Sequence, residues 1–126
     1  MVQIYEMRLH IDRKNAMQNL RSMEESLKLL KAGHSLVIYP EGSLNASGKL
    51  NSFRKGCLKL EAKAGVPVVP ITLINTNRVM NRAGRGIHRS SVKCIISAPI
   101  SFNRFDKKSE NTQVEKVREI IAKNLI

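Results

Sequence analysis

Three short apolar runs, separated by polar and helical sequence, constrain the fold of this chain most strongly. The runs cover residues 35–39, 68–74 and 92–97, and Pro40 ends the first of them. Such runs are typical of strands, and those at 35–39 and 68–74 are expected to be buried on both faces of a sheet. Residues 8–12 partly alternate in polarity and predict a further, shorter strand.

Three segments have the spacing of amphipathic helices. The first follows a predicted cap at Asn15 and ends at Gly33, the second runs from Ser52 to Gly65, and the third begins with a capping box at Thr112. The apolar face of each consists of Ala16, Leu20, Met23, Leu27 and Leu30 in the first, Phe53, Cys57, Leu60 and Ala64 in the second, and Val114, Val117, Ile121 and Leu125 in the third. Alternation of strands and helices predicts an α/β fold with a mostly parallel sheet flanked by helices.

The 126 residues show no internal repeat and fit one domain covering 1–126. Right-handed crossovers in a parallel sheet bring the loops that follow strands to one edge, where ligands usually bind. We expect the loop at 40–52, which is rich in Gly, Ser and Asn, at that edge. Residues 75–91 are predicted to be irregular and basic.

The charge is strongly unbalanced, because 22 Lys and Arg face 10 Asp and Glu, which gives a net charge of +12. Such a surface attracts the phosphates of nucleic acids, anionic lipids or small molecules. The segment 78–108 is especially basic, and either docks on an anionic membrane or is ordinary solvated surface. No apolar stretch approaches the roughly 20 residues of a spanning helix, and early charges argue against a signal peptide. A cytoplasmic protein is therefore expected.

Nucleic acid is the other partner class that this charge permits. The chain has two Tyr, three Phe and no Trp, so it offers few aromatic platforms on which bases could stack. We therefore expect no nucleic-acid partner. Cys57 and Cys94 make neither a metal-ligand spacing nor a disulfide framework, and no metal or cofactor is predicted.

Residues 40–43, Pro-Glu-Gly-Ser, follow the first apolar run directly. Gly42 allows the backbone to turn sharply and to approach a ligand closely. Ser43 offers a hydroxyl to a phosphate or glycerol oxygen, and Glu41 could orient a hydroxyl or a base. A plain turn is the alternative interpretation, since Pro, Gly and Ser are common turn residues.

Three cations stand where an anion could bind. Arg54 and Lys55 lie at the predicted start of the second helix, where free backbone amides favour an anion. Cations there oppose the helix dipole unless an anion binds between them. Arg13 follows the predicted strand at 8–12, and an Arg side chain binds phosphate through two parallel hydrogen bonds. Solvated surface charge is the alternative for all three.

Together these motifs resemble conserved blocks of the glycerolipid acyltransferases, the 1-acylglycerol-3-phosphate (lysophosphatidate) acyltransferase proteins. The family pattern Phe-Pro-Glu-Gly-Thr/Ser is matched at 39–43, Phe-Lys/Arg-x-Gly at 53–56, and Val-Pro-x-x-Pro at 66–70. Residues 10–13, His-Ile-Asp-Arg, resemble the preceding block of the family. The resemblance covers residues 8–75, which leaves 76–126 as a basic loop with a terminal strand and helix.

The resemblance implies an acyltransferase of phospholipid biosynthesis at the inner face of the membrane. The family transfers a fatty acyl group from an acyl-carrier-protein or CoA thioester to a hydroxyl of lysophosphatidate, and the thioester is a substrate, so no separate cofactor is implied. A His held by an Asp, in a His-x4-Asp block, is the family's general base. The residues that it implies for binding of the acceptor are Arg13, Glu41, Gly42, Ser43, Arg54 and Lys55.

Two departures from the family pattern matter. Leu44 stands where the family usually has Arg, and Arg54, Lys55 and Lys49 are the candidates to replace that cation. The His-x4-Asp block is absent, because no Asp lies five residues after any of the histidines, which are His10, His34 and His88. We therefore expect the C-terminal part of an acyltransferase domain: a misplaced start, a split gene or a decayed copy. Such a chain would self-associate or pair with a missing N-terminal half, and a non-catalytic protein that binds lipid phosphates is the alternative.

Overall fold

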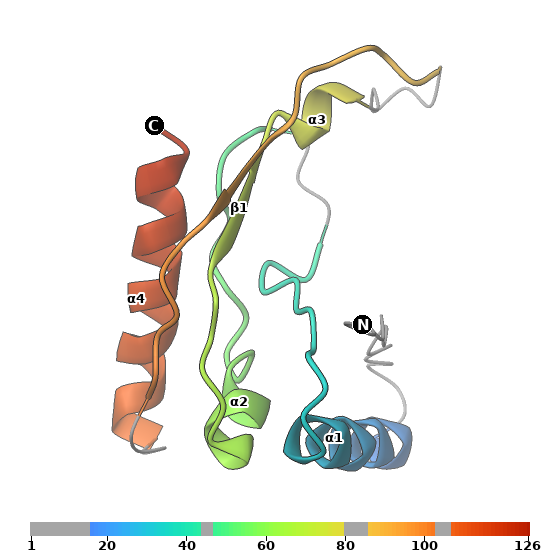
Figure 1. Cartoon of the computed structure of the whole chain (residues 1–126), viewed down its shortest axis with the longest axis vertical. Helices are drawn as coiled ribbons and strands as arrows, with labels where there is room; N and C mark the ends of the chain where they lie inside the picture. The colour runs from blue at the N-terminus through green and yellow to red at the C-terminus, as the bar shows by residue number, and fades with distance from the viewer. Residues whose placement is uncertain (1–15, 44–46, 80–85, 103–106) are drawn as a thin grey trace.

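The computed structural model describes residues 16–43, 47–79, 86–102 and 107–126. Two helices come first, and strands and helices then alternate along the rest of these residues (Figure 1). Their bounds, in chain order, are α1 Ala16–Lys31, α2 Lys59–Ala64, β1 Ile71–Ile74, α3 Thr76–Val79, β2 Lys93–Ile96 and α4 Lys107–Asn124. The predicted mixture of helix and strand is confirmed, and α4 runs along one side of the strands (Figure 1).

The sheet differs from the expectation. β1 and β2 pair antiparallel, with Ile71 opposite Ile96 and Leu73 opposite Cys94, so the predicted mostly parallel sheet is wrong for the described residues. A bridge between Val68 and Ile100 extends the pairing beyond the strand ends. A parallel pair needs a crossover that passes over a face of the sheet. Here α3 lies past the end of β1 instead, and the chain returns beside the strand that it has just left (Figure 1).

The run at 35–39 is not a strand, because it pairs with no strand among the described residues. Val37 and Tyr39 are exposed, although their apolar neighbours predict burial on both faces. A sheet position needs ladder partners on at least one side. The further strand predicted at residues 8–12 lies outside the described residues, as does the cap predicted at Asn15.

The helices follow the predicted pattern with shifted ends. α1 ends just before Gly33 as expected, and Gly65 ends α2 in a left-handed conformation (φ 67°). α2 begins at Lys59, later than predicted from Ser52, because Gly56 at φ 80° interrupts helical geometry. The predicted start of the last helix at Thr112 is also wrong, since α4 already begins at Lys107.

The core lies between α4, the segment before α2 and the strands. Leu58, Val114 and Val117 are buried there. Partly buried apolar side chains surround these three residues, namely Phe53, Cys57, Val68, Ile100, Phe102 and Ile121. At the other end of α4, the Asn124 side-chain amide donates to the hydroxyls of Thr72 (3.1 Å) and Ser97 (3.2 Å). The terminal helix is therefore fixed to the sheet by apolar packing and by hydrogen bonds. Within the described ranges, no helix is long and apolar enough to cross a membrane.

Candidate functional site

The Pro-Glu-Gly-Ser sequence forms a tight turn. The Gly42 amide donates a hydrogen bond to the Tyr39 carbonyl at 3.1 Å, and Gly42 has a φ of 65°. Residues other than glycine rarely adopt this left-handed conformation. The turn is thus specified by the glycine, as the sequence predicts.

Arg54 folds back onto this turn and closes it. Its backbone amide donates to the Pro40 carbonyl (2.9 Å), and its Nη2 donates to the Gly42 carbonyl (3.1 Å). A Cβ atom added to Gly42 would overlap the Arg54 guanidinium. The backbone conformation therefore favours glycine, and any other residue would displace the Arg54 side chain from the turn. We call Pro40, Glu41, Gly42, Asn51 and Arg54 the Gly42–Arg54 clasp.

Glu41 holds the second side of the clasp. Its Oε2 accepts a hydrogen bond from the Asn51 amide at 2.9 Å, which fixes the returning chain ten residues away. The Asn51 carbonyl in turn accepts a hydrogen bond from Nε of Arg118 on α4 at 3.2 Å. Nη1 of Arg118 also forms an ion pair with Oε2 of Glu115 at 3.8 Å. The carboxylate of Glu41 is therefore engaged in positioning the loop, and the loop is anchored to the terminal helix.

The positive side chains in and beside the clasp face solvent. Arg54 and Lys55 are both exposed, as is the hydroxyl-bearing Ser43. A guanidinium has five N–H donors, so Arg54 can bond the Gly42 carbonyl and still donate to an anion. Such charge-assisted bonds to a phosphate are among the stronger hydrogen bonds in proteins. The arrangement can therefore hold an anionic group in front of the turn.

The structure brings together some of the predicted site residues. Glu41, Gly42 and Arg54 are joined through the clasp. Ser43 and Lys55 are close in sequence to it, but no hydrogen bond joins either side chain to the clasp in the part of the chain that the structure describes. Arg13 lies outside the described residues. Lys49, a candidate to replace the cation missing at Leu44, is exposed in the loop between the two halves.

Two positions of the site escape sequence reasoning. Asn51 acts through its backbone, which leaves no signature in residue type, and Arg118 contacts it from 67 residues away. Asn77 of α3 also borders the loop, since a Cβ on Gly48 would lie 3.2 Å from its Nδ2. Local sequence patterns cannot reveal contacts between residues that are so far apart in the chain.

The Cys57 thiol is not an activated nucleophile. Burial, with the nearby charges of Glu61 and Glu110, raises the pKa of Cys57 to about 11. Such a thiol stays protonated and unreactive near neutral pH. Burial also raises the pKa of Glu61. The described residues include no group of three or more His, Cys, Asp or Glu that could hold a metal ion.

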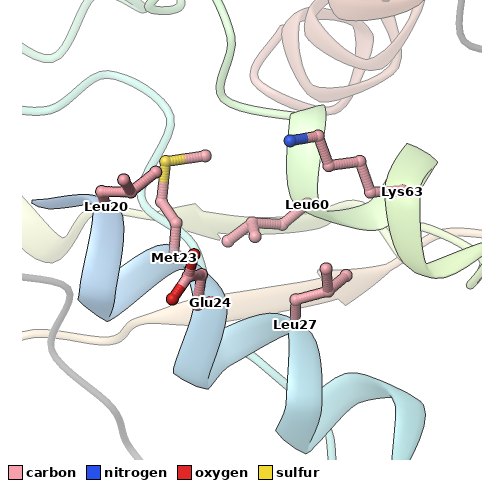
Figure 2. A pocket seen from close by; sticks show the side chains of 6 residues that line it. All are labelled: Leu20, Met23, Glu24, Leu27, Leu60 and Lys63. Atoms are coloured by element: carbon pink, nitrogen blue, oxygen red, sulfur yellow. The ribbon is translucent and has the colours of Figure 1, made fainter.

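An open groove lies between α1 and α2, at a distance from the clasp in sequence. Figure 2 shows side chains from both helices pointing into it. Its volume is about 260 Å³. The lining residues are Leu20, Met23, Glu24, Leu27, Leu60 and Lys63. The apolar stripe predicted for the first helix therefore forms one wall of a groove that stays open.

Comparison with known proteins places the clasp in a family. The sequence profile of the Acyltransferase family matches residues 8–74, which include both halves of the clasp. A chloroplast 1-acyl-sn-glycerol-3-phosphate acyltransferase of Arabidopsis thaliana is 40% identical over 85 residues, covering 67% of this chain and 24% of that protein. A probable 1-acyl-sn-glycerol-3-phosphate acyltransferase of Mycoplasma genitalium is 31% identical over 122 residues, covering 89% of this chain and 44% of that protein.

A solved structure agrees with these relatives. The 1-acyl-sn-glycerophosphate acyltransferase PlsC of Thermotoga maritima matches with a TM-score of 0.76 and 26% identity, over 86% of this chain and 44% of that one. The chain thus spans less than half the length of each of these relatives. The family profile, the relatives and the shared fold agree with the motifs around Gly42 and Arg54, and this chain belongs to the glycerolipid acyltransferase family.

Proposed function

We propose that this chain supplies the glycerol-phosphate-binding part of a phospholipid-synthesising acyltransferase. The reaction transfers a fatty acyl group from an acyl-carrier-protein or CoA thioester to 1-acylglycerol-3-phosphate. The Gly42–Arg54 clasp is the observation on which this proposal rests. It presents an exposed guanidinium beside a glycine turn, and the relatives that share the sequence are named for a phosphate-bearing acceptor.

In this proposal the residues of the chain bind and orient the acceptor. Arg54 donates to the phosphate, Lys55 adds positive charge, and the Ser43 hydroxyl contacts a phosphate or glycerol oxygen. Glu41 keeps the loop in place through the Asn51 amide. Arg13 is a further phosphate ligand by family resemblance. The chemical step needs a general base that removes the proton of the acceptor hydroxyl as the oxygen attacks the thioester carbonyl.

The source of the general base distinguishes two possible functions, acyl transfer and non-catalytic binding of lipid phosphates. The His-x4-Asp block of the family does not occur in these 126 residues. Either the base comes from sequence joined to or paired with this chain, or the protein binds lipid phosphates without catalysis. In both cases we expect the protein at the inner, cytoplasmic face of the membrane, in contact with anionic lipid.

Binding of the acceptor headgroup tests the proposal. We expect the full chain to bind sn-glycerol 3-phosphate and lysophosphatidate, and to bind lysophosphatidylcholine weakly because its phosphate carries one charge fewer. Arg54→Gln should weaken binding about tenfold or more, since a charge-assisted hydrogen bond contributes roughly 1.5–3 kcal/mol. Arg21→Gln, which removes an exposed Arg from α1, is the matched control and should bind normally. Equal losses in both variants would reduce the clasp to ordinary surface charge.

An assay of acyl transfer separates the two functions. The chain alone should transfer no acyl group. Addition of the upstream part of a family member that has the His-x4-Asp block should restore transfer if this chain is the acceptor-binding part of an enzyme. Bound lysophosphatidate with no transfer under those conditions would favour the non-catalytic lipid-phosphate binder.

A further inference from the structure

The connection between β1 and β2 extends beyond the ends of the two strands and is held together by hydrogen bonds. We use the name basic arm for its described residues together with the start of β2: 75–79, 86–92 and Lys93. In Figure 1 it extends from the end of the strands, away from α4. Its two halves are joined, because the His88 amide donates to the Val79 carbonyl (2.9 Å) and the Asn75 side chain donates to the Ser91 carbonyl (3.4 Å).

The arm lies in the most one-sided charge environment of the chain. All ten acidic residues stand at or before Glu61, or at or after Asp106, so residues 62–105 contain none. On the arm Arg78, Arg89 and Lys93 are exposed. Cations without neighbouring carboxylates are not neutralised locally, and their field favours an anionic partner surface.

An apolar side chain stands among these cations. Ile87 is 80% exposed, a larger fraction than for any other exposed large apolar residue of the described chain except the terminal Ile126. Val92, 43% exposed, follows on the same arm. Exposed apolar side chains cost free energy in water. An exposed apolar side chain beside Arg and Lys offers the two attractions, apolar burial and attraction to anionic lipids, that hold amphipathic segments at a bilayer surface.

The arm also borders the candidate site. Asn77, on α3, lies against the loop at Gly48 that connects the two halves of the Gly42–Arg54 clasp, since a Cβ on Gly48 would come within 3.2 Å of its Nδ2. A surface held by the arm would therefore be adjacent to the loop of the clasp. This is the arrangement needed by a site whose acceptor is itself a lipid.

We propose that the basic arm docks this protein on an anionic bilayer. Ile87 enters the boundary between headgroups and acyl chains, while Arg78, Arg89 and Lys93 contact lipid phosphates. The charge and the exposed apolar side chain are independent of the proposed acyl transfer. The choice of a lipid surface over other anionic surfaces rests in part on that function.

Vesicle flotation with the full chain tests the arm, because floating vesicles separate bound protein from protein aggregates. We expect binding to vesicles of equal parts phosphatidylglycerol and phosphatidylcholine, and weak binding to pure phosphatidylcholine. Arg89→Gln should weaken binding to the anionic vesicles about fivefold, which corresponds to ~1 kcal/mol for one basic residue near the surface. Ile87→Gln should weaken it by about tenfold. Far-ultraviolet circular dichroism shows whether each variant remains folded.

Two matched variants are the controls. Arg21→Gln removes an exposed Arg from α1, and Ile126→Gln removes an exposed Ile at the other end of the chain. Both should float like the unmodified protein. The proposal is overturned if the unmodified chain does not float on anionic vesicles, or if the control variants lose as much binding as the arm variants.

Nucleic acid is the competing occupant of a basic arm. Duplex DNA bound more tightly than the anionic vesicles, with Arg89→Gln weakening only the binding to DNA, would overturn the lipid assignment. Failure of the proposed function has a different signature. Loss of sn-glycerol 3-phosphate binding, together with normal flotation and the expected effects of Ile87→Gln and Arg89→Gln, would reject the clasp as an acceptor site and support the arm.

Discussion

The two faces of the β1–β2 sheet differ sharply in how they are covered. On the face toward α4, Thr72 is 1% exposed and bonded to Asn124. Successive strand residues point to opposite faces, and on the other face Ile71 is 50% and Ile96 is 70% exposed. The groove between α1 and α2 is likewise open (Figure 2).

This difference separates the residues that stabilise the fold from the residues that form exposed apolar surface. The core cluster lies between α4, Leu58 and the covered face of the sheet, and Leu30 of α1 and Leu60 of α2 are buried outside it. The uncovered face is an apolar surface without a packing layer among the described residues, and the groove leaves Leu20 exposed although Leu60 opposite it is buried. Stability and surface behaviour should therefore respond to substitutions in different regions, and the following measurements test that separation.

The largest effect is expected on the covered side. Leu58→Ala removes a buried side chain from the core cluster and should lower the free energy of unfolding by roughly 2–5 kcal/mol. Leu20→Ala removes the same atoms from an open wall of the groove, where Leu20 is 56% exposed, and should cost far less. Urea titrations measure both. Equal losses would mean that the groove is part of the stabilising core.

A smaller loss of stability, with a specific loss of binding, is expected at the clasp. Gly42→Ala places a side chain on a residue in the left-handed conformation and in the space of Arg54. The free energy of unfolding should therefore fall by about 1–3 kcal/mol. Gly33→Ala shares a positive φ (91°) but meets no atom within 4 Å. Both variants should lose stability, but Gly42→Ala alone should lose sn-glycerol 3-phosphate binding. Normal binding by Gly42→Ala would show that the position of Arg54 does not matter.

Self-association should come from the uncovered face. A strand face with exposed Ile71, Leu73 and Ile96 predicts concentration-dependent association in size-exclusion chromatography. Ile96→Lys should shift the protein toward monomer, whereas Ile126→Lys adds the same charge away from the sheet and should not. Alkylation of the exposed Cys94, which lies opposite Leu73, should slow as the protein concentration rises. A monodisperse unmodified monomer would contradict this expectation.

The smallest effect is a pH dependence at Glu61 on the covered side. Burial raises the pKa of Glu61 in the folded state, and its Oε2 has no hydrogen-bond partner among the described residues. The unfolded state therefore loses its proton first, so stability falls as the pH rises above the ordinary pKa of 4.5 and levels off above the raised one. Glu61→Gln should flatten this part of the pH profile of thermal unfolding. The exposed carboxyl of Glu25, changed to Gln, should leave it unchanged.

Local patterns predict the elements of this fold better than their pairing. The helix at α1, the glycine that ends α2 and the strands at β1 and β2 each depend on neighbouring residues, and all are confirmed. The predicted burial of the run at 68–74 on both faces is wrong, because Ile71 and Leu73 are exposed. The antiparallel pairing depends on where the chain goes between the strands, which residue spacing does not encode. Residues 35–39 have strand composition but lack a partner strand among the described residues.

The same limit applies to the candidate site. The motifs predict Gly42 as a turn and Arg54 as a nearby cation, because both have local signatures. The hydrogen bonds that hold them, from the Asn51 amide to Glu41 and from Arg118 to the Asn51 carbonyl, use backbone atoms and distant sequence. Their contribution appears only when the chain is folded.

The central claim is that the Gly42–Arg54 clasp binds the glycerol phosphate while α4 only supports it. The most direct test is a titration of the isotope-labelled chain with sn-glycerol 3-phosphate, followed by amide chemical shifts. We expect saturable shifts at Gly42, Ser43 and Arg54, with Val114 and Val117 in the core almost unchanged. Shifts confined to the basic arm, or none at all at the clasp, would contradict it.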